Sequence, residues 1–337
     1  TLYNIYINLY ICLINERFFI MINIDFNNVL TNNIWDLDDI SYNGIEVLSM
    51  NKAQLIKVFK DYNFTTLLSK SNPKLEKNKK ELNLYSIGLS IAPHVLNNNK
   101  NSNIIYDVCT NSTKPCRSNC VIWQAGNPLY IPAKRKAMLN RKNMFTSNPT
   151  LFMACLIRSI ELESIYSIKN ELIMTYRGNI SQDIKWESIQ VIYNNKSTTM
   201  INIIDTFIQS TKLNNIDNVS YDYTKHYNRK QNKNYHLAYS VTDNDINKSL
   251  IAIKNGLDLA IVFDTPRNKD LPKTYKLGNK VLQVFDGDKN DFIAENRTKL
   301  NKPSIRGLRF KYKASHKKDM RIKSLDNAIK QGFVKQA

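Results

Sequence analysis

The chain has 337 residues, of which 42% are hydrophobic and 10% aromatic, a composition that fits a folded globular protein and excludes a disordered one. Lys and Arg outnumber Asp and Glu by 48 to 29, which gives a formal net charge of +19 and favours an anionic partner such as nucleic acid. Asn-rich stretches such as "NNNKNSN" at 97–103 fit equally well with an AT-rich genome whose codons favour Lys and Asn. The charge alone therefore does not establish binding.

The first segment, residues 3–14, reads "YNIYINLYICLI" and is apolar. Asn4 and Asn8 interrupt this run, and it falls short of the ~20 residues that a membrane-spanning helix needs. We therefore expect no membrane anchor. Met21 is a candidate start of the protein, so residues 1–20 are treated as a doubtful leader.

Three further parts follow along the chain. Residues 21–70 are expected to form a small N-terminal segment with a helix near 51–62, where apolar residues recur at helical spacing. The charged residues 71–83 are expected to be a linker. Residues 84–337 are expected to form one α/β domain with a basic C-terminal tail.

Strand-like and helix-like segments alternate after residue 84. The predicted strands are 84–93, 171–179, 218–225, 234–241, 257–264, 280–288 and 304–312, and the predicted helices are 132–145, 149–164, 198–211 and 244–256. This alternation predicts an α/β fold with a mainly parallel sheet. An incomplete or open β/α barrel-like sheet is the leading architecture, and a doubly wound parallel sheet is the alternative.

Polar side chains stand at the ends of these strands. Functional sites of such folds gather at the carboxyl ends of the strands, although turns also use polar residues for their own sake. The set therefore indicates which edge of the sheet to inspect. Its members are Arg177, Asp222, Lys225, Ser240, Asp264, Asp286 and Asp288.

The stretch "YDVCTNSTKPCRSNC" at 106–120 holds three of the five cysteines, Cys109, Cys116 and Cys120. Such clustering in a chain without a disulfide-like spacing predicts metal or redox chemistry. The neighbouring Lys114 and Arg117 favour the thiolate form, which is the form that binds metals.

Two kinds of metal site fit this turn. Three cysteines can hold three corners of a four-iron cluster and leave the fourth iron open. A structural zinc ion would need a fourth ligand, for which Asp107 and His94 are candidates. No second Cys or Cys/His pair stands at the usual zinc spacing, which favours iron–sulfur over zinc. Cys12 and Cys155 are expected to be inert.

Several phrases resemble, in their order, the bacteriophage family called gene product 88 over roughly residues 84–337. They are "CTNSTKPCRSNC" followed by "QAG", then "AKRKAML", "RGNISQDIKW", "YDYTK", "YHLAYS", "NGLDLAIVF", "VFDGDKNDF" and "RGLRFK". The resemblance implies a phage or mobile-element protein that works in the cytoplasm of the host cell. It implies no particular reaction.

More distantly, a three-Cys turn after the first strand of an α/β chain is similar to the turn of radical S-adenosylmethionine enzymes. The resemblance implies Cys109, Cys116 and Cys120 as ligands of a four-iron cluster whose open iron binds S-adenosylmethionine. The gaps of six and three residues here are wider than the gaps usual in those enzymes.

Two functional hypotheses follow. The first is an iron–sulfur enzyme of radical type that acts on a nucleic acid or nucleotide, with a pocket shaped by Arg177, Asp183, Asp222, Lys225 and His236. The second is a non-enzymatic nucleic-acid-binding protein with a structural zinc ion. In this second hypothesis the phosphate contacts come from Lys134, Arg135, Lys136, Arg141, Arg306 and Arg309. A phage accessory protein with reduced thiols and no metal is the third alternative.

Overall fold

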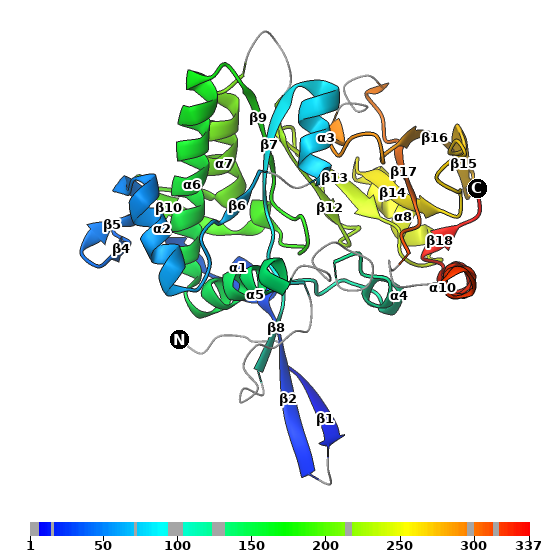
Figure 1. The fold of residues 1–337 in the computed structure, drawn as a ribbon, viewed down its shortest axis with the longest axis horizontal. Coiled ribbons are helices and arrows are strands. Elements are labelled where there is room, and N and C mark those ends of the chain that lie inside the picture. The colour runs from blue at the N-terminus through cyan, green and yellow to red at the C-terminus, as the bar shows by residue number, and fades with distance from the viewer. Residues whose placement is uncertain are drawn as a thin grey trace.

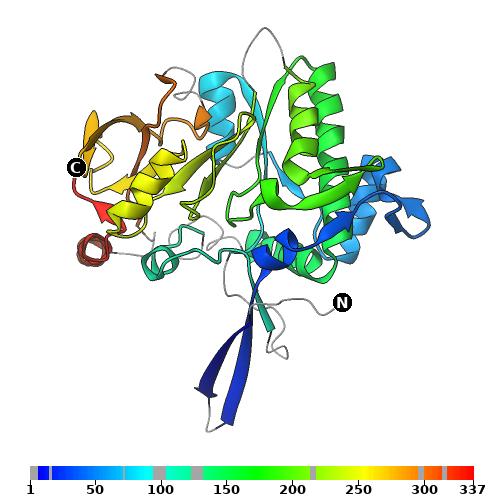
Figure 2. The ribbon, with the colours of Figure 1, turned by 180° about the vertical axis from the view of Figure 1, so that it is seen from behind.

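The computed structural model describes residues 7–14, 17–70, 73–93, 104–122, 132–212, 218–294, 300–312 and 317–337. Its central feature is a ten-stranded, mostly parallel sheet with helices packed around it (Figures 1 and 2). The strands of this sheet are β6 (Leu68–Ser69), β7 (Leu84–Leu89), β9 (Ile173–Arg177), β12 (Ser220–Thr224), β13 (Tyr235–Ser240), β14 (Asp258–Phe263), β15 (Thr274–Leu277), β16 (Lys280–Asp286), β17 (Ile305–Arg309) and β18 (Val334–Lys335).

The parallel strands from β7 to β14 lie side by side in chain order. The order across the sheet is β6-β7-β9-β12-β13-β14-β17-β16-β15, and only the outermost pairs, β6 with β7 and β15 with β16, are antiparallel. From β7 to β14 each new strand is added on the same side of the previous one, whereas a doubly wound sheet reverses its direction. β17 then lies between β14 and β16, although β16 precedes it in the chain. The sheet does not close, so the prediction of an open β/α barrel-like sheet is confirmed.

The last strand, β18, pairs with β14 beyond the part of β14 that pairs with β13. β13 pairs with β14 through Ala260, whereas β18 pairs with Val262 and Phe263 farther along the same strand. The end of the chain therefore lies beside the carboxyl end of β14.

The helices are α1 (Phe26–Thr31), α2 (Lys52–Asp61), α3 (Pro73–Leu82), α4 (Lys114–Ser118), α5 (Pro132–Ser147), α6 (Pro149–Lys169), α7 (Met200–Gln209), α8 (Ile246–Lys254) and α10 (Lys318–Lys330). Two short 3₁₀ helices are η1 (Val47–Ser49) and η3 (Trp186–Ser188). No described helix is both long and apolar enough to cross a membrane.

Small sheets flank the main one. The hairpin of β1 (Ile7–Ile14) and β2 (Arg17–Asp25) pairs with β8 (Ile104–Asp107) and projects from the body of the molecule (Figure 1). A second small sheet joins β10 (Gln190–Tyr193) and β11 (Lys196–Thr199) to β3 (Ile34–Asp36), and β4 (Ser41–Tyr42) pairs with β5 (Ile45–Glu46).

The central strands alternate between two packed faces, as the period of a strand requires. Met174, Tyr176 and Leu237 point into the main core, which α6, α7 and α8 help to form. The intervening residues, such as Ile173 and Tyr221, point to the opposite face and pack against the segment at 292–294. This second face is called the inner face below.

The charged segment expected to be a linker is the helix α3. Leu75 and Asn78 are buried on it three residues apart, which is the spacing of one helix face. Asn78 donates hydrogen bonds to Ser86 Oγ (2.9 Å) and Tyr221 Oη (2.8 Å). Because these contacts hold α3 on the inner face of the sheet, the segment is part of the fold and not a flexible connection.

Candidate active site

A pocket opens at the carboxyl edge of the sheet, with a volume of about 200 Å³ accessible to water-sized molecules. The last inward-facing residue of each of five adjoining strands lines it. These residues are Arg177 of β9, Tyr223 of β12, Ser240 of β13, Val262 of β14 and Leu308 of β17. The pocket therefore lies where an open barrel is expected to carry its site.

All three clustered cysteines line this pocket. Cys109 follows β8 and is buried, Cys116 lies in α4, and Cys120 comes just after α4. In Figure 1, α4 lies at the lower end of β12 and β13, below the carboxyl edge of the sheet.

The turn that carries the cysteines is fixed by hydrogen bonds. The buried Asp107 carboxylate accepts from the Cys109 amide (2.8 Å) and from Arg117 Nη2 (2.7 Å). Thr113 caps α4 by accepting from the Cys116 amide (3.2 Å), as an N-cap threonine commonly does. Asp107 is therefore engaged in holding the turn, and His94, the other candidate fourth ligand, lies outside the described residues.

The loop after β9 forms a second wall. Gln182 Oε1 accepts from the Ile91 amide (3.0 Å), and the Asp183 amide donates to the Val108 carbonyl (2.9 Å). Cys109 Sγ lies 3.8 Å from the Ser181 carbonyl. These contacts connect the loop to the residues around the Cys turn, although more than sixty residues separate the two in the sequence.

Arg177, Asp183 and Lys225, three of the predicted pocket residues, line the pocket. Arg177 is buried, forms an ion pair with Asp291, and lies with its guanidinium carbon 4.9 Å from the centre of the Tyr223 ring. Burial lowers the pKa of Arg177, but the Asp291 carboxylate outweighs this effect and holds the pKa above its ordinary value. Arg177 is thus a permanent cation.

Asp183 accepts a hydrogen bond from the Lys225 amide at Oδ2 (2.6 Å), and its Oδ1 lies 3.5 Å from Arg229 Nη1. His226 Nε2 is 4.0 Å from the same carboxylate. Burial lowers the pKa of His226 to about 4, so this imidazole is neutral near pH 7.

The structure does not bring Asp222 and His236 to the pocket. Asp222 points to the face opposite Tyr223, where it accepts from the Asn179 amide (2.6 Å) and Tyr235 Oη (2.5 Å). His236 is the second residue of β13, at its amino end, whereas Ser240 of the same strand lines the pocket. Asp222 points away from the pocket because successive side chains of a strand alternate between its two faces. His236 lies away from the pocket because it is at the amino end of its strand, and the pocket is at the carboxyl end.

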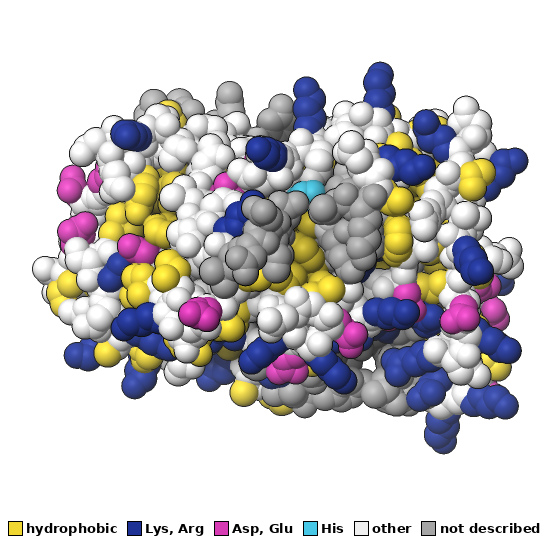
Figure 3. Space-filling model, turned by 90° about the horizontal axis from the view of Figure 1, so that it is seen from above, with side chains coloured by type: hydrophobic (Ala, Val, Ile, Leu, Met, Phe, Trp, Pro, Cys, Tyr) yellow, Lys and Arg dark blue, Asp and Glu magenta, His cyan; other side chains and the backbone are white. Residues whose placement is uncertain are grey.

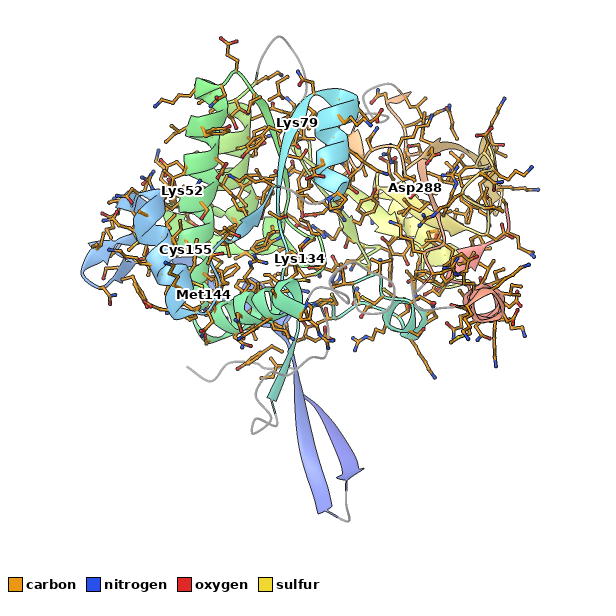
Figure 4. The ribbon with its side chains drawn as sticks, viewed as in Figure 1. Lys52, Lys79, Lys134, Met144, Cys155 and Asp288 are labelled. Atoms are coloured by element: carbon orange, nitrogen blue, oxygen red, sulfur yellow. The ribbon has the colours of Figure 1, made fainter. Side chains whose placement is uncertain are left out.

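Among the described residues, no group of three His, Cys, Asp or Glu side chains is close enough to hold a single metal ion. The fourth described cysteine, Cys155, is fully buried in α6, and burial raises its pKa to about 12. Figure 4 shows Cys155 within α6, away from α4.

The residues predicted to contact nucleic acid differ in exposure. Lys134 and Lys136 are exposed near the start of α5, and Arg135 between them is half-buried (Figure 4 labels Lys134). Arg141, by contrast, is buried and donates to the carbonyls of Thr66 (2.9 Å) and Ser90 (3.2 Å).

The two predicted arginines of β17 are also engaged within the fold. Arg306 is buried and donates to Asn290 Oδ1 (3.0 Å). Arg309 lines the pocket and pairs with Asp286 (3.0 Å) and Asp288 (3.2 Å). Their guanidinium groups therefore stabilise loops at the edge of the sheet.

Sequence reasoning missed the wall formed by Phe310, Lys311 and Phe333. The first two directly follow β17, so the strand-end rule applied to residues 304–312 would have found them. Phe333 precedes β18 and reaches the pocket only through the pairing of β18 with β14. Nearby, Gln331 Oε1 accepts a hydrogen bond from Ser118 Oγ (3.3 Å) in the Cys turn.

An open, singly wound β/α sheet with a pocket at its carboxyl edge defines an α/β protein of the open-barrel class. The chain belongs to the bacteriophage gene product 88 family, because the model of that family, "Gene product 88", matches residues 66–324. The match begins before α3 and includes every strand that lines the pocket. No curated protein and no solved structure gave a significant match.

Proposed function

We propose that this protein is an iron–sulfur enzyme of radical type, in which Cys109, Cys116 and Cys120 hold a four-iron cluster and S-adenosylmethionine is the cofactor. One observation carries the proposal: the three cysteines line the same pocket as the strand-end residues Arg177 and Lys225. Metal ligands and polar strand-end groups that share a pocket are the usual composition of an enzyme site.

The arrangement of the thiols supports a cluster over zinc. In a four-iron cluster each thiolate binds a different iron, so the ligands surround a wider object than a single ion. A structural zinc ion needs four protein ligands, whereas the turn supplies three cysteines and the Asp107 carboxylate is already engaged by the Cys109 amide and Arg117. Three cysteines that line one pocket therefore fit a four-iron cluster better than a single zinc ion.

The chain's own residues would prepare the site. Asp107 orients both Cys109 and Arg117, and the ion pair with Asp291 holds Arg177 in place at the pocket. The apolar residues Val262 and Leu308 also line the pocket, and an apolar lining would help to protect reactive species from side reactions. When bound, such a cluster supplies single electrons for reductive chemistry on a cofactor.

Metal analysis after anaerobic purification tests the proposal. The wild-type protein, reconstituted with iron and sulfide, is expected to bind about four irons with matching sulfide, as a four-iron cluster requires. Cys109→Ala, Cys116→Ala and Cys120→Ala are each expected to lose most of this iron and the associated visible absorption.

Cys155→Ala is the matched control, because it removes a thiol outside the pocket and should retain the iron. A wild-type protein without iron after careful reconstitution would contradict the proposal. Equal iron in all four variants would do the same. Stoichiometric zinc that depends on the three pocket cysteines would replace it with a structural zinc site.

Nucleic-acid binding is the second candidate function, which the exposed cations favour. Lys134 and Lys136 are exposed on α5, and Lys318, Arg321 and Lys323 are exposed on α10. A protein of a phage family would meet its nucleic acid in the cytoplasm of the host cell. This function is compatible with the first, since a radical enzyme with a nucleotide substrate also needs contacts to phosphate.

A further inference from the structure

The pocket has an excess of positive charge. Four cationic side chains line it, Arg177, Lys225, Arg309 and Lys311, against the single carboxylate of Asp183. In a partly enclosed site such an excess attracts anions more strongly than on an open surface, because the low dielectric of the walls strengthens the field.

The two arginines are already neutralised by the fold. Arg177 pairs with Asp291, and Arg309 pairs with Asp286 and Asp288. In the parts of the chain that the structure describes, no carboxylate forms an ion pair with either lysine.

Asp183 does not neutralise the lysines. Its Oδ2 accepts from the backbone amide of Lys225, and its Oδ1 faces Arg229. The two half-buried ammonium groups of Lys225 and Lys311 are therefore the charges available to a ligand.

An apolar wall adjoins these charges. Val262, Leu308, Phe310 and Phe333 line the pocket, and the rings of Phe310 and Phe333 lie 6.4 Å apart at 76°. Aromatic side chains provide a surface for a flat, apolar ring, and nucleobases stack on such surfaces whatever their sequence. The pocket thus combines a cationic part with an aromatic part.

We propose that the pocket binds an organic phosphate whose anionic group is anchored by Lys225 and Lys311 and whose flat body packs against Phe310 and Phe333. A nucleotide is the simplest such ligand. The two lysines follow different strands, β12 and β17, and a phosphate group can accept from both because its oxygens point in several directions. The role of this ligand as substrate rests on the function proposed above, but its binding does not.

Calorimetric titration of the metal-free protein tests this inference. The probes are adenosine 5′-monophosphate, adenosine and inorganic phosphate, each at low and at high salt. The monophosphate is expected to bind at least roughly tenfold more tightly than adenosine, because its phosphate group adds hydrogen bonds to the two charged lysines. Added salt is expected to reduce this difference.

Variants assign the binding to the two lysines. Lys225→Met and Lys311→Met are each expected to weaken monophosphate binding by roughly tenfold, and the Arg variants should restore most of it. Lys79→Met is the matched control, because Lys79 is exposed on α3, far from the pocket (Figure 4). Equal binding of monophosphate and adenosine, or unchanged binding by both Met variants, overturns the inference.

Two further arms identify the source of the phosphate. A short single-stranded oligonucleotide that binds more tightly than the monophosphate, with the same dependence on Lys225 and Lys311, identifies a nucleotide within a strand. Tighter binding of the monophosphate identifies a free nucleotide. S-adenosylhomocysteine carries a carboxylate but no phosphate, so loss of its binding in the lysine variants with no effect on the monophosphate would overturn the inference. Because no iron is present, failure of this test leaves the proposed cluster untouched.

Discussion

The fold raises the pKa of the Asp222 carboxyl group into a range of pH that is accessible to experiment. Asp222 is completely buried, and burial raises its pKa to about 7 although Tyr235 and Asn179 donate hydrogen bonds to it. Between about pH 4 and 7 the folded state keeps a proton that the unfolded state has lost. The free energy of unfolding therefore falls as pH rises through this range, because the buried group must ionise.

We expect Asp222→Asn to remove this dependence. The loss of stability between pH 5 and 8 should be smaller in the variant than in the wild type, by at most about 3 kcal/mol. Urea unfolding at several pH values measures the pH dependence of the free energy of unfolding. His226 acts in the opposite direction below about pH 6 because burial lowers its pKa to about 4, but it contributes equally to both proteins. Identical pH profiles would show that Asp222 is already ionised in the folded state.

At the scale of elements, one polar side chain of α3 forms several buried hydrogen bonds to the sheet and its neighbours, beside the apolar contact of Leu75. Asn78 is fully buried, donates to Ser86 and Tyr221, and accepts from the Asp291 amide (2.8 Å). Since Asp291 also pairs with Arg177, this single amide connects α3 to the network behind the pocket.

We expect Asn78→Ala to lower the free energy of unfolding by about 2–4 kcal/mol, because it leaves buried polar groups without partners. Chemical denaturation measures the change. Lys79→Ala, at the adjacent exposed position, should have little effect. If both variants were equally stable, α3 would be only loosely attached, as expected of a linker.

The central elements could be predicted because their residues follow a simple period. Each predicted strand from 84–93 to 304–312 contains an observed strand, and the five predicted helices correspond to α2, α5, α6, α7 and α8. Strands β11 and β15 and helix α3 carry weaker patterns, because exposed polar residues dominate them. Tertiary packing, and not local propensity, decides their structure.

The sequence could predict that the candidate site lies at the carboxyl edge of the sheet, but not which residues at that edge line the pocket. The strand-end rule found Arg177 and Lys225, and the Cys spacing found the facing turn. The strand-end rule failed for Asp222, because a shift of one residue along a strand moves a side chain to the other face of the sheet. The end of a strand cannot be located to within one residue from the sequence.

At the scale of the whole molecule, the positive charge is not confined to the pocket. Figure 3 shows Lys and Arg side chains spread over the face seen from above, with many on the side where β15 and β16 lie. A cationic surface of this extent speeds the approach of a polyanion, in a manner that salt weakens.

We therefore expect binding to single-stranded DNA whose affinity falls steeply with salt. Lys134→Gln combined with Lys136→Gln should reduce the logarithmic salt slope by about 1 for each phosphate that the variant no longer neutralises. Titration at several salt concentrations measures this slope. Lys52→Gln combined with Lys79→Gln is the matched control of equal charge, since both lysines are exposed on other elements (Figure 4). Equal slopes for the two double variants would indicate attraction by net charge alone.

The pairing of β18 with β14 has a consequence for the order of events during synthesis. It brings Phe333 to the pocket that the three cysteines line, and roughly 200 residues separate Cys120 from Phe333. At about 5–20 residues per second, a ribosome needs about 10–40 s to complete that stretch. For this interval the part of the wall that Phe333 supplies is missing, so the three thiols of the nascent chain are more accessible than in the finished protein.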